Sequence, residues 1–225
     1  MRGERDAGWK ARAAEPSPES PAPRAANPAA LDWHHELARK ALHLTTTSVP
    51  LAYAAGLPRR WVIALLVAAC GVALAVEWGR ATHAATRAAF DRVTGRLLRV
   101  HEHERWAGAT WLLLAFLGSV VIFPRAVAIV SMWAVAVGDA AAALVGRALG
   151  RHHLFGASKT IEGSLACFTA TLAGAVFVAR LPVSEGLIAA TAASLAEWPG
   201  RPLDDNIRIA AATGCGILLW GLAFS

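Results

Sequence analysis

Residues 126–145 read AVAIVSMWAVAVGDAAAALV, an apolar run in which Asp139 is the one charged side chain. A second run, residues 60–78, reads RWVIALLVAACGVALAVEW. About 20 residues of α-helix, at 1.5 Å each, cross the roughly 30 Å hydrocarbon core of a bilayer. Both runs therefore predict membrane-spanning helices, and the fold is predicted to be that of an all-α, polytopic membrane protein.

Further apolar segments on both sides of these runs predict a bundle of about seven transmembrane helices. The sixth segment is short and the first contains the three threonines 45–47, so six or eight spans remain open. The predicted spans are Ala41–Leu57, Trp61–Trp78, Ala107–Phe123, Ala126–Val145, Gly163–Leu181, Glu185–Trp198 and Ile209–Phe224.

The composition excludes several other classes of protein. Of the 225 residues, 56% are hydrophobic and only 17% are charged. The apolar segments are continuous rather than alternating, which excludes the strands of an outer-membrane β-barrel. The net charge of +6 comes with no nucleic-acid recognition motif. Basic loops that set topology and contact anionic lipid explain this charge, so the expected partner is the lipid bilayer and not a nucleic acid.

Residues 1–30 differ from the rest of the chain. They contain five prolines among Ala, Arg, Ser and Glu, and they have no apolar run. Such a segment buries too little apolar surface to fold, so it is predicted to be a disordered, Pro/Ala-rich tail on the cytosolic side. The folded transmembrane domain is predicted to cover residues 31–225.

The basic residues are distributed unevenly between the two sides of a seven-span bundle. The N-terminal segment and the loops after the second, fourth and sixth spans carry 18 of the 22 Lys and Arg residues. The other four are Arg59, Arg60, Arg125 and Arg180. The positive-inside rule therefore predicts that the N-terminus and the three basic loops are cytosolic.

Two polar features lie in and after the fourth predicted span. Asp139 is costly at membrane depth, about 2.5–3.5 kcal/mol, and such residues usually face a cavity, a metal or a partner. Alternatively, Asp139 is hydrated at the end of its span. After it come GRALGR, with Gly146, Arg147 and Gly150, and ASKTIEGS, with Ser158, Lys159, Thr160 and Glu162. Glycines let backbone N–H groups approach a phosphate and Lys adds a cation, although an ordinary basic loop has the same composition.

Two more polar clusters are predicted on the same side of the membrane. Arg39, Lys40 and His43, preceded by Glu36, share one helix face and suit an anionic headgroup or a nucleotide phosphate. A membrane-edge anchor is the alternative. In the last cytosolic loop, RPLDDNIRI carries adjacent carboxylates followed by an amide. Carboxylates of this kind are ligands for Mg²⁺, and they equally suit the N-cap of the last span. The three residues are Asp204, Asp205 and Asn206.

Together these motifs resemble the family of CTP-dependent lipid kinases, which includes dolichol kinases, phytol and farnesol kinases and the fungal CTP-dependent diacylglycerol kinase. The resemblance runs from Glu36 to the C-terminus through ELARKALH, RVHEHERWAGATW, GDAAAALVGRALGRHHLFGASKTIEGS and LDDN. The third of these blocks is the specific part. The chain is more distantly similar to phosphatidate cytidylyltransferases, but it lacks the signature that they carry in their last cytosolic loop.

The resemblance implies that residues 31–225 are a lipid kinase domain. Such a domain transfers the γ-phosphoryl group of CTP, with Mg²⁺, to a membrane lipid alcohol and releases CDP. The implied catalytic residues are Asp139, Lys159, Glu162 and Asp205. The implied metal ligands are Asp139, Glu162, Asp204 and Asp205. The implied nucleotide-binding residues are Arg39, Lys40, His43, Gly146, Arg147, Gly150, Ser158, Lys159, Thr160 and Asn206.

Several questions stay open at this point. The lipid alcohol could be a polyprenol or dolichol, phytol or farnesol, or diacylglycerol. The division of roles between base and metal ligand among the carboxylates is not decided, and neither is the oligomeric state. The alternative functions are that of a phosphatidate cytidylyltransferase, which releases pyrophosphate and makes a CDP-lipid, and that of a non-enzymatic transporter or lipid-binding scaffold.

The charge asymmetry predicts the topology of the chain directly. We expect a reporter fused before Met1 to be cytosolic and one fused after Ser225 to be extracytosolic, because seven spans place the two ends on opposite sides. Paired phosphatase and fluorescent-protein fusions measure this. Both ends reporting the same side would show an even number of spans.

Overall fold

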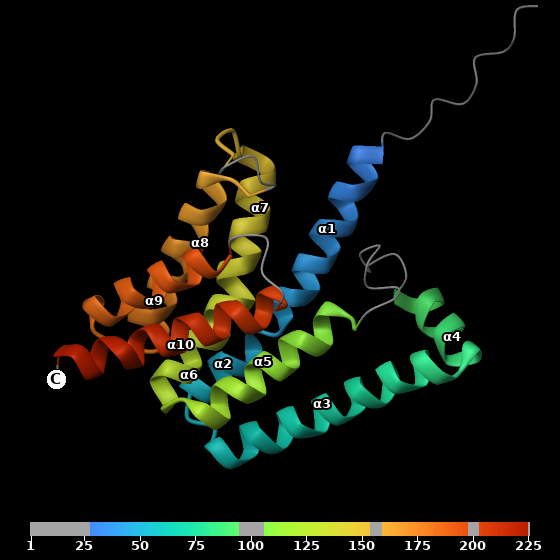
Figure 1. The fold of residues 1–225 in the computed structure, drawn as a ribbon, viewed down its shortest axis with the longest axis horizontal. Helices are drawn as coiled ribbons and strands as arrows, with labels where there is room; N and C mark the ends of the chain where they lie inside the picture. Colours follow the sequence, from blue (N-terminus) through green and yellow to red (C-terminus); the bar gives the residue numbers. More distant parts are fainter. Residues whose placement is uncertain (1–27, 95–105, 154–158, 198–202, 225) are drawn as a thin grey trace, which may run out of the picture.

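The computed structural model describes residues 28–94, 106–153, 159–197 and 203–224, and these residues form an all-α fold (Figure 1). Within these ranges there is no β-strand, only an isolated antiparallel bridge between His153 and Thr160. The predicted fold class is therefore confirmed. Most of the predicted tail, residues 1–27, lies outside the described residues, and the first helix begins at Pro28.

The helices follow one another with short connections. Pro58, Pro124 and Pro182 stand immediately before three of the helices, where the missing N–H of proline leaves no hydrogen bond unmade. The elements are α1 (Pro28–Thr45), α2 (Ser48–Ala54), α3 (Arg59–Thr82), α4 (Ala84–Thr94), α5 (Gly108–Ile122), α6 (Arg125–Trp133), η2 (Ala134–Gly138), α7 (Asp139–Leu149), α8 (Ile161–Ala173), η3 (Gly174–Val178), α9 (Val183–Ala196) and α10 (Asp205–Phe224).

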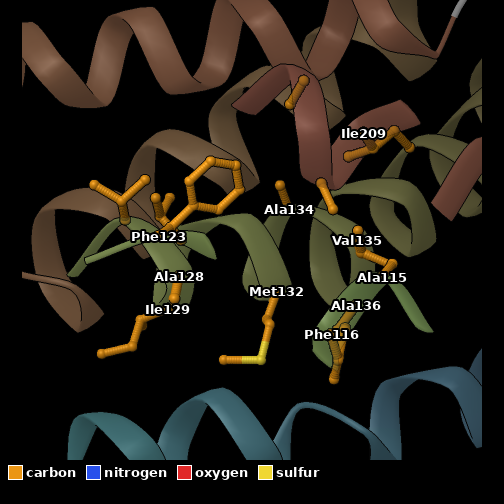
Figure 2. Packing of buried hydrophobic residues seen from close by; sticks show 14 of the residues in the cluster. Ala115, Phe116, Phe123, Ala128, Ile129, Met132, Ala134, Val135, Ala136 and Ile209 are labelled. Atoms are coloured by element: carbon orange, nitrogen blue, oxygen red, sulfur yellow. The ribbon is translucent and has the colours of Figure 1, made fainter. Parts of the chain in front are cut away.

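The continuous helix α6–η2–α7 is the centre of the bundle. Of its most apolar 18-residue window, 72% is buried, against 22–33% in the other three long apolar helices. Its side chains pack with those of α5 and α10, and Figure 2 shows Phe116 of α5 and Ile209 of α10 on opposite sides of this segment. The outer helices expose apolar side chains instead, which is the pattern expected of helices that face lipid.

The structure does not confirm the count of seven spans. Among the described residues, four helices are long and apolar enough to cross a membrane: Arg59–Thr82, Arg125–Leu149, Ile161–Val178 and Asp205–Phe224. Two shorter apolar helices, α5 and α9, correspond to the third and sixth predicted spans. The first predicted span is broken, because α1 ends at Thr45 and α2 has only seven residues. These helices indicate a multi-pass integral membrane protein.

Two arginines assigned to the sparsely charged side do lie together at one end of the bundle. Arg59 donates hydrogen bonds to the carbonyl oxygens of Val120 and Val121, at 3.0 and 2.7 Å. Arg125 donates to the carbonyl oxygen of Tyr53 and lies over its ring. These contacts join α2 and α3 to the connection between α5 and α6, at the N-terminal end of the α6–η2–α7 helix, whereas Asp139 lies near the middle of that helix.

Close packing between α6 and η3 depends on a glycine. The indole Nε1 of Trp133 donates to the carbonyl oxygen of Ala170 at 3.0 Å, which fixes the ring against Gly174. A Cβ atom on Gly174 would overlap that ring. Only a residue without a side chain fits at this position.

We therefore expect Gly174→Ala to destabilise the bundle by roughly 1–3 kcal/mol, the usual cost of overpacking a tight core. Gly71→Ala is the matched control, because a Cβ on Gly71 in α3 meets no atom within 4 Å. In an open helical position the same change stabilises by about 0.5–1 kcal/mol. Thermal unfolding in detergent measures both, and equal melting temperatures would contradict the packing role of Gly174.

Candidate active site

The centre of the site is a π-helical turn immediately before Asp139. In the turn η2, the Asp139 N–H bonds to the carbonyl oxygen of Ala134, five residues earlier, rather than to that of Val135. The Val135 carbonyl therefore accepts a hydrogen bond from His43 Nε2 at 2.8 Å. Because a carbonyl only accepts, His43 Nε2 carries the proton. Single π turns inside α-helices are frequent at functional sites, and this one joins α1 to the central helix.

Asp139 is buried and paired with Lys40. The ammonium of Lys40, only 1% exposed, donates to Asp139 Oδ2. His43 Nε2 lies 3.9 Å from the same oxygen. A buried charge is tolerated when it is paired and hydrogen-bonded. Asp139 is therefore an ionised carboxylate with one side on Lys40 and the other facing a cavity.

The first turn of α10 brings two further acids to that cavity. Asp204 Oδ1 accepts hydrogen bonds from the backbone N–H and the Nδ2 of Asn206, at 2.9 and 2.8 Å. Asn206 Nδ2 also donates to the carbonyl oxygen of Gly108 at 3.3 Å. Asp205 forms an ion pair with Arg208. Asp204 therefore caps the N-terminus of α10, and metal binding by this loop stays a prediction.

A pocket of about 410 Å³ joins these groups. It is bounded by α1, α3, α4, α5, α7 and α10, elements that are far apart in sequence. Six of the predicted site residues line it together: Arg39, His43, Asp139, Asp204, Asp205 and Asn206.

The remaining walls of the pocket are mainly apolar. They consist of side chains such as Leu42, Ala73, Val76, Phe90, Leu112 and Leu113. The pocket thus has an acidic end beside Asp139 and an apolar side formed by α3, α4 and α5.

Glu77 holds the apolar side together, and the sequence reasoning missed it. Its Oε1 accepts from the backbone N–H of Ala107 at 2.7 Å and from Thr110 Oγ1 at 3.0 Å. Its Oε2 accepts from Arg80 at 2.6 Å, and the Arg80 guanidinium lies over the ring of Phe90. One carboxylate thereby connects α3, α4 and α5. The sequence feature that could have pointed to this network is a Glu and an Arg three residues apart at the end of an apolar span.

Lys159 lies just outside the pocket and is paired with a second acid that the sequence reasoning missed. Its ammonium donates to Glu197 Oε1 at 2.9 Å. Burial alone lowers the pKa of Lys159, but the carboxylates of Glu197, Asp139 and Asp205 together raise this pKa above its ordinary value. Lys159 is therefore a cation at neutral pH, within electrostatic range of both acids at the end of the pocket.

The glycines of the predicted phosphate loop lie where α7 and α8 pack together. A Cβ on Gly146 would lie 2.9 Å from Thr160 Oγ1, and one on Gly150 would overlap the same side chain. Thr160 itself is the N-cap of α8, where its Oγ1 accepts from the Gly163 N–H at 3.2 Å. These residues do not line the pocket. Their position accounts for the glycines by close helix packing, and their role towards a nucleotide stays a prediction.

Three other predicted residues also lie away from the pocket or cannot be placed. Arg147 is exposed near the end of α7. The carboxylate of Glu162 pairs with His152 Nδ1 at 2.7 Å on the outside of the bundle. Ser158 lies outside the described residues. Asp139, Asp204 and Asp205 are thus the predicted metal ligands that share one cavity.

The donor chemistry of the pocket suits Mg²⁺ that arrives with a nucleotide. No three His, Cys, Asp or Glu side chains, among those that the structure describes, already form a metal-binding group. Mg²⁺ in phosphoryl-transfer sites is usually held by one or two carboxylates together with substrate phosphates. Asp139 of α7 and Asp205 of α10 would provide two carboxylates that line the same pocket.

Comparisons with known proteins find similarity to kinases of the predicted kind. The CTP-dependent diacylglycerol kinase 1 of Saccharomyces cerevisiae is 28% identical over 139 residues, which cover 60% of this chain and 47% of that protein. The protein of the same name from Eremothecium gossypii is 32% identical over 138 residues, 60% of this chain and 43% of that protein. An uncharacterized protein of Rickettsia prowazekii is 27% identical over 144 residues, 63% of this chain and 69% of that protein.

The two fungal proteins are CTP-dependent lipid kinases by name, so these similarities confirm the resemblance indicated by the motifs. The chain spans less than half the length of the two fungal kinases. No family model and no solved structure matches the chain.

The Lys40–Asp139 pair gives a stability prediction. Asp139→Asn leaves a buried ammonium without a counter-ion, and Lys40→Met leaves a buried carboxylate without one. Breaking a buried pair in this way costs roughly 3–5 kcal/mol, whereas removing both charges is often neutral. We expect each single variant to melt well below the unaltered chain in detergent and the double variant to recover most of the loss. Additive losses in the double variant would show that the two charges do not stabilise each other.

Proposed function

We propose that this chain is a CTP-dependent kinase that phosphorylates the hydroxyl group of a membrane lipid. The observation that carries the proposal is the composition of the pocket, which places Asp139, Asp205 and Arg39 at one end of a largely apolar cavity. A water-soluble phosphoryl donor needs the charged end. A lipid alcohol needs the apolar walls. A transporter or scaffold does not need a charged end and apolar walls in the same cavity.

The apolar side would receive the lipid with its hydroxyl group towards Asp139. Leu42, Val76 and Leu112 offer apolar contact to the carbon chain next to the hydroxyl. The Glu77 network would keep α3, α4 and α5 at a fixed separation and so preserve the width of this wall. Holding the two reactants in this way is the main contribution that a protein makes to phosphoryl transfer, because the reaction needs little covalent help.

CTP would bind from the side of Lys159 and Arg39, whose positive charges balance the triphosphate. The lipid oxygen attacks the γ-phosphorus, the bond from the γ-phosphorus to the β–γ bridging oxygen breaks, and CDP leaves. The hydroxyl proton passes to a carboxylate at the end of the pocket. Asp139 and Asp205 would hold Mg²⁺, which, when bound, neutralises the negative charge that develops on the phosphoryl oxygens.

Diacylglycerol is the first lipid to test, because two similar proteins are named as diacylglycerol kinases. Its hydroxyl group is attached directly to a three-carbon backbone with two acyl chains. Farnesol, phytol and polyprenols instead present a hydroxyl at the end of a single chain. The residues that line the pocket favour neither class of lipid, so the assay compares the two classes side by side.

We expect the purified chain with Mg²⁺ and γ-labelled CTP to transfer the label to lipid and to release unlabelled CDP. ATP is expected to be a much poorer donor. Transfer with ATP but not with CTP would contradict the proposal that CTP is the phosphoryl donor, but it would leave the proposed lipid kinase activity intact. Release of labelled pyrophosphate together with a CDP-lipid would instead identify a cytidylyltransferase.

The double variant Asp139→Asn, Lys40→Met separates catalysis from folding. It lacks both charges of the buried pair, so no ion is left unpaired and the variant is expected to fold. It also lacks one proposed metal ligand. Metal contacts to a transferred phosphoryl group are worth several kcal/mol, and each 1.36 kcal/mol is about tenfold in rate. We expect at least a roughly hundredfold loss of turnover at saturating lipid. Near-normal turnover in this folded variant would place the reaction elsewhere.

A further inference from the structure

Glu197 is a buried acid that has no part in the function described so far. It caps the C-terminal end of α9 and is only 2% exposed. Its carboxylate forms an ion pair with the Lys159 ammonium, at 2.9 Å. The two residues are 38 positions apart in the chain, and the contact joins the end of α9 to the start of α8. Burying a carboxylate to this degree costs free energy of folding unless an opposite charge pairs with it.

The backbone around Lys159 is also held in place. Thr160 caps α8 through its Oγ1, and the N–H of Ile161 donates to the carbonyl oxygen of His152 at 2.9 Å. Lys159 therefore stands immediately before the N-terminus of a helix, an end that favours anions. Its backbone is fixed by the cap, and its side chain is fixed by Glu197.

The Lys159 ammonium lies between the protein interior and the solvent. Its side chain is 28% exposed, whereas that of Glu197 is 2% exposed. A lysine ammonium has three donors, and Glu197 accepts from one of them. The charge of Lys159 also interacts with Asp139 and Asp205 at the end of the pocket. A donor of Lys159 can thus face a triphosphate while Glu197 holds the same ammonium from behind.

We propose that Glu197 is a positioning residue that holds the ammonium of Lys159 at the place where the CTP triphosphate binds. This inference rests on the function proposed above, and it assigns a role to a residue outside every motif of the sequence. The opposing explanation is structural: the ion pair merely ties α9 to α8. The two explanations differ in what happens when the pair is kept but shifted.

Glu197→Asp provides that shift. Aspartate keeps the charge and the ion pair, but it is shorter by one methylene and draws the ammonium away from the nucleotide. We expect this variant to fold and to melt close to the unaltered chain, with a KM for CTP raised roughly tenfold or more and an unchanged KM for lipid, because the displaced ammonium loses a charge-assisted hydrogen bond to the triphosphate. Glu185→Gln, at the other end of α9, is the control for altering an acid on this helix and should leave both KM values unchanged.

A double-variant cycle with Lys159 tests the same inference without relying on the folding of a single Glu197 variant. Lys159→Gln with Glu197→Gln removes both charges and leaves no unpaired ion. If Glu197 acts through Lys159, the double variant and Lys159→Gln alone use CTP equally well, because coupled residues are not additive. A further loss of fivefold or more in the double variant would overturn the inference.

The outcomes separate this inference from the proposed function. No CTP-dependent transfer by the unaltered chain overturns both. Transfer by the unaltered chain with a normal KM for CTP in Glu197→Asp overturns the inference and leaves the kinase intact. A raised KM for CTP alone, together with the non-additive cycle, supports a positioning role, because a purely structural tie gives no reason for CTP and lipid to be affected differently.

Discussion

The charge of Asp139 determines how α1 packs against the central helix of the bundle. This carboxylate lies in the most deeply buried helix of the bundle and is balanced by Lys40, whose ammonium is almost completely buried. The pairing requires α1 to pack against η2 and α7. Once α1 is there, the Val135 carbonyl released by the π turn binds His43, and Arg39 on the same helix reaches the pocket.

The same arrangement produces a cavity of mixed chemistry. The acids at one end belong to α7 and α10, and the apolar walls belong to α3, α4 and α5. Glu77 of α3 accepts hydrogen bonds from the start of α5 and from Arg80, and the Arg80 guanidinium in turn lies over the ring of Phe90 in α4. A buried ion pair and a buried carboxylate network therefore set the two sides of a site that, on our proposal, brings a nucleotide to a membrane lipid.

Several site residues were predicted because their types and spacing were unusual for a membrane segment. Asp139 interrupts an apolar run, and Arg39 and His43 share a helix face with Lys40. Glu197 escaped notice because one acid at the end of a short apolar segment looks like an interfacial residue. Gly146 and Gly150 suggested a phosphate loop, but in the structure they allow close packing against Thr160. The sequence shows only that a glycine is present and does not distinguish these two reasons for it.

The fold class, the central apolar helix and the family resemblance follow from the amino-acid sequence, because run length, composition and motif spacing are local properties. The packing of the helices was needed to show that Lys40 pairs with Asp139, that Lys159 pairs with Glu197, and that the first predicted span is broken after Thr45. Ion pairs between residues 99 and 38 positions apart depend on how helices pack. No local pattern contains that information.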